Sequence, residues 1–488
     1  MKTFIRISSL LVLIAFSGFN AWSFCGFYVA KADASLFNNK SEVIMVRDGK
    51  RNVITMSSDF KGDFKDFAMV VPVPVVLKET DIKVVNRRIF DVLNDYSAPR
   101  LVEYHDYNPC NNGYKYLCFS ESVEMATAMP ARNESDKLKK EDYKVTIEAQ
   151  YQIGEYDILI LSAKESSGLK NWLVDNGYKI PGAAEEILEP YVKSNMKFFV
   201  VKVNLDKVPA ATEYLSPIQL SFEHDKFMLP LRLGMANSQG SQDMIVYAFT
   251  RNGRVECTNY RTVKLPTDRN IPLFVKSEFG SFYKSLFEKQ YVSEGRNAVF
   301  LEYAWNLSPY NTMHCDPCVG PPPVNQDFVD AGIWWLNETD VVQSIFFTRL
   351  HVRYTRDKFP SDLQFQVTPN SELFQCRYIL TNPATGEFEC EEGQAYLNTL
   401  YERRKKEIDE MYALASWNWQ KRSSDYLNEY VAQMKEKPQT EDKKNGILPV
   451  FSGGESGGPS PWLVVFVLLS MMIGLLLSTT GFGRLKKV

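Results

Sequence analysis

The chain has 488 residues, of which 45% are hydrophobic and 13% aromatic, so it can bury a large core and form two or three domains. Its formal net charge is −3 and no basic stripe runs along it, which argues against nucleic acid as a partner. The basic run 403–406 is typical of the solvated face of a helix.

The N-terminus has the pattern of a secretory signal peptide. Lys2 and Arg6 precede a short apolar stretch, and Ala21 and Ser23 supply small residues at the −3 and −1 positions of a cleavage site. The apolar stretch is short for a membrane span, so an uncleaved anchor is the less favoured alternative. The sequence therefore predicts a signal peptide over residues 1–23, cleaved after Ser23.

Strand-like runs follow the predicted cleavage site. Two apolar runs, 43–46 and 53–56, flank an Asp-Gly step that favours a tight turn, and together they predict a hairpin. A third run, 67–76, contains Pro72 and Pro74, which lack backbone donors. This third strand is therefore expected to lie at an edge or to end early. Apolar residues at helical spacing predict a helix over 81–96.

The middle of the chain predicts mixed sheet and helix. Predicted strands cover 144–151, 156–161, 198–203, 218–223, 227–233, 244–249 and 255–260, and predicted helices cover 166–176, 184–193, 280–303 and 392–437. The last of these helical regions is interrupted near Ser423 and Ser424. We expect an α+β ectodomain of two packed subdomains, 24–206 and 215–437.

The C-terminus predicts a membrane anchor. Residues 438–460 are polar and rich in glycine and serine, which predicts a flexible stalk. The uncharged apolar run that follows is long enough to cross a ~30 Å hydrocarbon core, so we predict a transmembrane helix over 461–482. Basic residues in the tail, 483–488, predict that the C-terminus is cytoplasmic. Glycines before the span also resemble a glycine-glycine sorting signal, so proteolytic removal of the span stays open.

All eight cysteines follow the predicted cleavage site: Cys25, Cys110, Cys118, Cys257, Cys315, Cys318, Cys376 and Cys390. An even count in an exported chain favours disulfides, although eight cysteines allow 105 pairings. Close spacing around turn-rich sequence makes Cys110–Cys118 and Cys376–Cys390 the natural local pairs, each worth ~2–3 kcal/mol. Elimination leaves Cys25–Cys257 as a long-range pair.

The most distinctive motif is His314-Cys315-Asp316-Pro317-Cys318, which is soon followed by three prolines. A redox-active pair would require a helix beginning here, and the prolines disfavour one. A zinc knuckle would require a second pair of ligands, which the sequence does not supply. A structural disulfide between Cys315 and Cys318 is the favoured interpretation.

No motif has both the residues and the context of a catalytic site. Residues 454–458 match a nucleophile elbow, but they lie in the stalk rather than between a strand and a helix. The four histidines form no HExxH motif, and no glycine-rich phosphate loop follows a strand. The sequence therefore predicts no catalytic residue, no metal site and no cofactor.

Several segments together carry a family resemblance: 24–29 (FCGFYV), 67–74 (FAMVVPVP), 229–233 (LPLRL), 315–318 (CDPC), and 348–351 (TRLH) continuing to Tyr354. Shorter matches are Tyr156-Asp157, Trp172-Leu173 and Asn176-Gly177-Tyr178. This ordered set resembles the bacterial family called domain of unknown function 2330. The resemblance implies an exported bacterial protein, often membrane-tethered, without an assigned reaction, and it transfers no catalytic residue to this chain.

The expected function is that of a non-enzymatic binding or cell-envelope interaction module. We expect its ectodomain in the periplasm or at the cell surface, with the membrane and an envelope protein or ligand as partners. The alternative is an extracytoplasmic enzyme, with thiol–disulfide exchange at Cys315 and Cys318 as its reaction.

Overall fold

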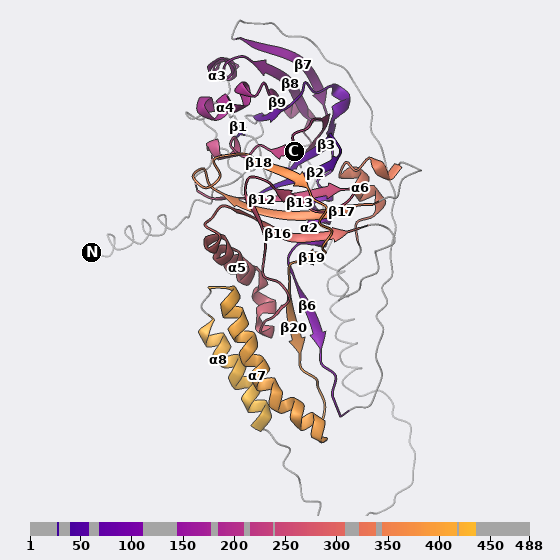
Figure 1. The fold of residues 1–488 in the computed structure, drawn as a ribbon, viewed down its shortest axis with the longest axis vertical. Coiled ribbons are helices and arrows are strands. Elements are labelled where there is room, and N and C mark those ends of the chain that lie inside the picture. The colour runs from indigo at the N-terminus through magenta and orange to yellow at the C-terminus, as the bar shows by residue number, and fades with distance from the viewer. Residues whose placement is uncertain are drawn as a thin grey trace, which may run out of the picture. The chain divides into compact units, whose positions relative to one another are not determined.

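The computed structural model describes residues 27–28, 40–57, 68–110, 144–176, 184–208, 215–237, 240–307, 322–337, 344–416 and 419–435 (Figure 1). The chain divides into two compact units, Met1–Lys435 and Glu436–Val488, and all described residues belong to the first. Among these residues, no helix has the length and apolar character needed to cross a membrane. The predicted signal peptide, stalk and transmembrane helix lie outside the described residues.

Strands make up most of the regular structure. They are β1 (Phe27–Tyr28), β2 (Lys40–Asp48), β3 (Arg51–Ser57), β4 (Ala68–Val73), β5 (Ile82–Val84), β6 (Arg100–His105), β7 (Val145–Ile153), β8 (Tyr156–Ala163), β9 (Lys197–Val203), β10 (Ile218–Glu223), β11 (Met228–Leu229), β12 (Gln242–Thr250), β13 (Val255–Cys257), β14 (Arg261–Lys264), β15 (Arg269–Asn270), β16 (Ala298–Asn306), β17 (Phe346–Tyr354), β18 (Leu363–Val367), β19 (Phe374–Gln375) and β20 (Arg377–Asn382). The α-helices are α2 (Arg88–Ser97), α3 (Ser166–Asp175), α4 (Ala184–Lys193), α5 (Phe279–Ser293), α6 (Asn325–Asp330), α7 (Glu391–Leu414) and α8 (Gln420–Lys435).

A nine-stranded mixed sheet forms the centre of the unit. Its strands run in the order β14-β16-β17-β12-β2-β3-β10-β5, with β19 paired to β16. The predicted hairpin is confirmed, because β2 and β3 pair antiparallel around a turn in which Gly49 has φ +55°. β12 lies between β17, which is antiparallel to it, and β2, which is parallel to it.

A five-stranded antiparallel sheet, β1-β4-β9-β8-β7, packs against the β3–β10 end of the central sheet. Met56 and Leu220 of the central sheet share a buried cluster with Val71 and Phe199 of this second sheet. Helices α3 and α4 cover its other face through Leu169, Leu188 and neighbouring apolar residues (Figure 1). As predicted, β4 ends early, at Val73 just before Pro74.

Two small sheets complete the unit. Strands β11-β18-β13 share a buried cluster with the central sheet, and β15-β20-β6 form a parallel sheet beside α7. Helices α7 and α8 lie side by side (Figure 1).

Three helix predictions and one strand prediction were partly wrong. The predicted helix 81–96 begins only at Arg88, because Ile82 and its neighbours pair with β10 as β5. The predicted helix 280–303 ends at Ser293, where Gly295 and Arg296 adopt positive φ, and residues 298–306 form β16. The predicted strand 227–233 is only two residues long. The break in the last helical region falls at 415–419 rather than at 423–424.

The fold is therefore mixed α+β, with strand-rich sheets and several helices. Strands from both predicted subdomains, 24–206 and 215–437, share the central sheet. The boundary between those subdomains stays a prediction, which limited proteolysis near residues 208–215 would test.

Candidate functional site

The segment 348–354, which carries part of the family resemblance, lies on β17 in the middle of the central sheet. Side chains alternate between the two faces of a strand. Leu350 and Val352 therefore enter an apolar cluster on one face, while Arg349, His351 and Arg353 lie on the other. A run of charged residues on a central strand requires partners, because burying an unpaired charge costs several kcal/mol.

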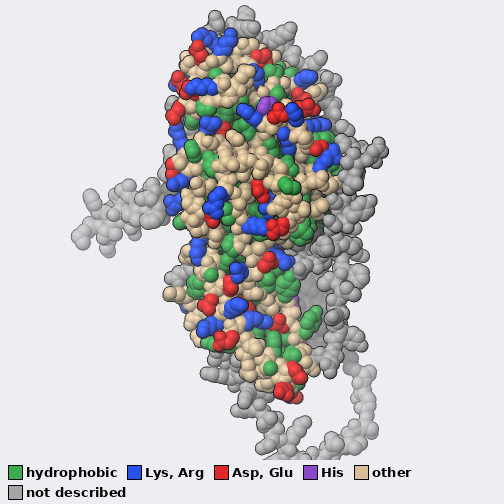
Figure 2. Space-filling view, viewed as in Figure 1, with side chains coloured by type: hydrophobic (Ala, Val, Ile, Leu, Met, Phe, Trp, Pro, Cys, Tyr) green, Lys and Arg blue, Asp and Glu red, His purple; other side chains and the backbone are tan. Residues whose placement is uncertain are grey.

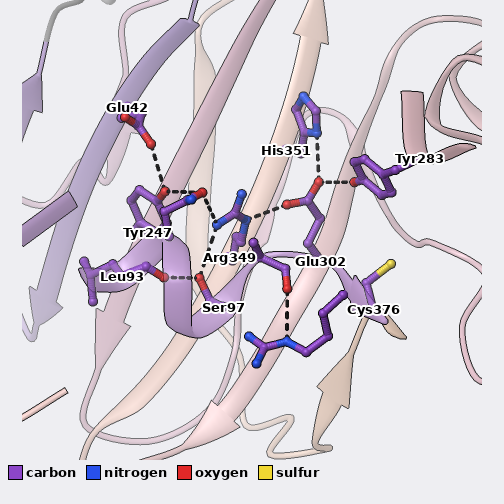
Figure 3. A network of polar contacts seen from close by, with 12 residues as sticks. Glu42, Leu93, Ser97, Tyr247, Tyr283, Glu302, Arg349, His351 and Cys376 are labelled. Atoms are coloured by element: carbon purple, nitrogen blue, oxygen red, sulfur yellow. Dashed lines mark hydrogen bonds and ion pairs between the residues drawn. The ribbon is translucent and has the colours of Figure 1, made fainter. Parts of the chain in front are cut away.

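Glu302 is the partner at the centre of this polar face. It lies on β16 where the register with β17 shifts between Leu301 and Tyr303, and such a bulge redirects a side chain. One carboxylate oxygen of Glu302 accepts a hydrogen bond from Arg349 Nε at 2.5 Å. The other oxygen lies 2.8 Å from His351 Nδ1 and also accepts a hydrogen bond from the Tyr283 hydroxyl (Figure 3).

The network continues in both directions from Glu302. Arg349 also donates to Asn94 at 3.1 Å and to Ser97 at 3.3 Å, both on α2. Towards the surface, His351 Nε2 lies 3.0 Å from Asp243, and Arg353 contacts both oxygens of the same carboxylate at 2.9 Å. The chain of contacts thus joins β12, β16, β17, α2 and α5.

A second carboxylate lies at the α2 end of the network. The Tyr247 hydroxyl donates to Glu42 at 2.9 Å (Figure 3), and Glu42 also pairs with Arg87 at 3.3 Å. The Arg349 guanidinium lies 5.3 Å from the centre of the Tyr247 ring. These contacts extend the polar face of the central sheet to β2.

The electrostatics favour the ionised form of these groups. Burial opposes the charge of Glu302, but Arg349 and His351 outweigh it and lower the pKa of Glu302 to about 2. Burial likewise opposes the charge of His351, yet Glu302 and Asp243 raise its pKa above the usual value. Since each ring nitrogen faces a carboxylate, we infer that His351 is an imidazolium donating to both.

This network is suited to holding strands together rather than to reacting with a ligand. The side chains of Glu302 and Arg349 are only 1% and 5% exposed. The Glu302 oxygens accept from three donors and the side chain is buried, so a substrate would have little access to this carboxylate. Within the described residues, His, Cys, Asp and Glu side chains form no cluster of three that could hold a metal ion.

An apolar pocket lies at the junction of the two larger sheets and is the candidate binding site. Its cavity is small, about 20 Å³, which is little more than a single water molecule needs. Strands β3 and β10 contribute Ile54, Met56, Leu220 and Phe222 to its wall. Ligand pockets are usually lined mainly by apolar side chains, with a few polar groups that fix orientation.

Two segments of the family resemblance meet at this pocket. Val71 to Pro74, from the segment 67–74, form one side, and Leu229 and Pro230, from the segment 229–233, form another. These segments are more than 150 residues apart in the sequence, so the sequence alone did not indicate that they share a site.

The polar groups at the pocket are few. Of its lining side chains, only Asn52 and Lys226 are polar. Asn52 is buried and saturated, since it donates to the Lys50 and His224 carbonyls and accepts from Arg47. Lys226 is exposed, and no described carboxylate pairs with its ammonium group.

The cysteine pairing differs from the local pairs predicted. A disulfide joins Cys110 to Cys390, so the predicted pairs Cys110–Cys118 and Cys376–Cys390 are wrong. The physical reason is that β6 and β20 are parallel neighbours, which carries the residues after both strands to the same place. Proximity in sequence was therefore a poor guide to proximity in the fold.

Cys376 and Cys257 are buried free thiols, so the pairing of Cys257 with Cys25 is wrong too. The Cys376 sulfur lies 3.2 Å from the Tyr378 hydroxyl, and burial raises the pKa of this thiol. Both features suit an inert core cysteine. The remaining candidates, Cys25, Cys118, Cys315 and Cys318, lie outside the described residues.

Surface charge on the face in Figure 2 is mixed, with Lys and Arg side chains interspersed among Asp and Glu. The segment 348–354 stands out in the sequence, but its partners Asp243 and Glu302 do not. They lie on other strands: Glu302 is a single acidic residue inside an apolar run, and Asp243 stands just before one.

Comparison with known proteins identifies a family but no characterised relative. Neither the curated proteins nor the solved structures contain a significant match. Residues 20–366 match the model of DUF2330, described as an uncharacterized protein conserved in bacteria. The match spans most of the chain and includes both the polar network and the pocket. The chain therefore belongs to the DUF2330 family of uncharacterized bacterial proteins.

Proposed function

We propose that this protein is an exported, membrane-tethered module of the bacterial cell envelope that binds a partner or ligand without transforming it. The observation that carries the proposal is the Cys110–Cys390 disulfide, which links residues 280 apart. Such bonds persist in oxidising compartments and are rare in the bacterial cytoplasm. This agrees with the signal peptide predicted over 1–23.

Binding is favoured over catalysis by how the polar side chains are used. The charged groups at the centre of the large sheet pair with one another, with Glu302 accepting from three donors. The pocket between the two larger sheets is small and its lining is almost wholly apolar, so it holds no pair of groups placed for acid–base chemistry. The helix predicted over 461–482 and the stalk before it would hold the binding module near the membrane.

Peptide mapping of the cysteines in cells tests the proposal. Free thiols are alkylated in intact cells before lysis, and disulfide-linked peptides are identified by mass spectrometry. We expect Cys110 linked to Cys390 in the full chain, and both thiols alkylated in a matched variant lacking residues 2–23. A linked pair in the variant, or a reduced pair in the full chain, would contradict export.

The same experiment separates binding from thiol–disulfide exchange. A Cys315–Cys318 bridge that opens under mild reductant, at a potential typical of known exchangers, would overturn the non-enzymatic proposal. A bridge that resists the same reductant would support it.

A further inference from the structure

The outermost strand of the five-stranded sheet is β7, at the top of Figure 1. β8 pairs with one side of β7 from Val145 to Ile153, and in the part of the chain that the structure describes no strand pairs with the other side. Among the described strands that end a sheet, β7 is the longest. Unpaired backbone groups along such an edge are a template for a further strand.

The hairpin between β7 and β8 fixes which backbone groups of β7 face outwards. Its loop has two residues, of which the first is Gly154 at φ +57°. The residues that flank a two-residue loop exchange both of their hydrogen bonds, and bonded and non-bonded pairs then alternate along the ladder. Every second residue back from Ile153 therefore bonds to β8, whereas the N–H and C=O groups of Gln150 and Gln152 point away from it.

A bulge divides β7 into two parts. The register with β8 shifts at Glu148, and the apolar side chains change faces there. Val145 and Ile147 pack against the cluster beneath α3 and α4, whereas the apolar side chains within 149–153 pack against the cluster between the two larger sheets. Bulges and charged residues protect an edge from pairing, so the stretch open to a partner is 149–153.

The stretch 149–153 has the composition of a strand that accepts a partner. It contains no charged residue and no proline, the residues that usually protect an edge strand. Tyr151 and Ile153 are only half-buried, at the rim of the cluster between the two sheets. A strand added here would cover the rim of this cluster as well as the outward backbone groups.

We infer that β7 pairs with β7 of a second copy of this chain, antiparallel and centred on Tyr151, so that two five-stranded sheets join into one. In this register Gln150 of each copy lies opposite Gln152 of the other. Because the backbone groups of both residues point outwards, each such pair can exchange two hydrogen bonds. The two Tyr151 side chains lie directly opposite each other, and aromatic pairs of this kind stabilise antiparallel strands.

Self-complementarity selects a second copy rather than an unrelated peptide. The twofold arrangement satisfies the outward groups of Gln150 and Gln152 in both copies, and it places Glu148 opposite Gly154, so that no like charges meet. The pairing goes beyond the proposed function and does not depend on it. A membrane tether on both copies would only raise their effective concentration.

Disulfide crosslinking of the purified full chain in detergent tests the register. Tyr151→Cys would place two thiols across a non-hydrogen-bonded pair, whose Cα atoms lie about 4.5 Å apart, within reach of a disulfide. We expect this variant to form a covalent dimer under mild oxidation. Thr146→Cys, at an exposed residue of the same strand beyond the bulge, is the matched control and should not exceed the wild-type background.

Analytical ultracentrifugation measures the strength of the pairing. Gln150→Pro removes an outward N–H in each copy without removing a hydrogen bond to β8, so the Kd of the dimer should rise at least about tenfold. Gln150→Ala keeps this N–H and should leave the Kd nearly unchanged. Similar melting temperatures of the two variants would show that pairing with β8 survives, and the crosslinking decides if the proline variant does not fold.

Three results would each overturn the inference: a wild type that stays monomeric in detergent and in membranes, a dimer that Gln150→Pro leaves as tight as Gln150→Ala does, or equal crosslinking at positions 146 and 151. Crosslinks from position 151 to a different protein or to another part of the chain would also overturn it. These measurements use purified chain, so their failure is distinct from absence of the Cys110–Cys390 bond in cells, which counts against the proposed function.

Discussion

Replacement of Glu302 by glutamine is the sharpest perturbation of the central sheet. The substitution keeps the shape of the side chain but removes the charge that faces Arg349 and His351. A glutamine offers one acceptor oxygen to a site with three donors, and its own amide group would face a donor. The variant therefore leaves a guanidinium that is 5% exposed without its counter-ion.

Removing one partner of a buried ion pair costs about 3–5 kcal/mol. We expect Glu302→Gln to lower the free energy of unfolding by that amount, measured by urea denaturation followed by tryptophan fluorescence. Glu288→Gln is the matched control, because Glu288 also pairs with an arginine but its side chain is 52% exposed. Its cost should stay below about 1 kcal/mol.

A double variant separates charge from packing. Glu302→Leu combined with Arg349→Met removes both charges, and we expect it to lose less stability than Glu302→Gln alone, since no buried guanidinium is left without a counter-ion and His351 keeps Asp243 as its partner. The reasoning would be refuted if Glu302→Gln cost no more than Glu288→Gln.

Three further predictions concern other parts of the fold. Because the folded-state pKa of His351 is raised, the stability that its charge contributes should be fully present below its unfolded pKa of about 6.5 and be lost as pH rises through the folded value. The unfolding free energies of the wild type and of His351→Gln should therefore converge towards high pH. A difference between them that widens at high pH would contradict the ion pairing. Gly253→Ala should lower the free energy of unfolding by at least about 3 kcal/mol, because φ is +80° and the added Cβ would lie 1.9 Å from a backbone oxygen. Gly49→Ala, at φ +55° with open space around the added Cβ, should lower it by only about 1–2 kcal/mol. Thermal unfolding compares the two variants, and equal losses would refute the steric argument. Replacing Cys110 by serine should lower stability by about 2–5 kcal/mol under oxidising conditions and leave it unchanged under reducing ones, while a cost that persists after reduction would implicate packing instead.

The sequence predicted correctly the strands that turn residues and prolines mark directly. The β2–β3 hairpin was readable because an Asp-Gly step separates two apolar runs, and the early end of β4 because Pro74 follows it. β16 was missed because its run of buried apolar residues has no alternation to mark a strand. Gly295, just after α5, was the available signal that the helix ended there.

The sites were less predictable, because their parts come from distant segments. Glu302 meets Arg349 across 47 positions and His351 meets Asp243 across 108, and no local motif links them. Parallel pairing of β6 with β20 brought Cys110 to Cys390, which spacing alone ranked below the local pairs. The pocket likewise forms only where two sheets pack together, and no sequence pattern indicated that packing.

Protease treatment of intact spheroplasts tests export and tethering most directly. With the outer membrane opened, added protease should digest the chain up to the predicted stalk, 438–460, and leave a small membrane-bound fragment. A tag placed after Val488 should remain protected inside the cell. Full protection of residues 24–435 under these conditions would contradict the account.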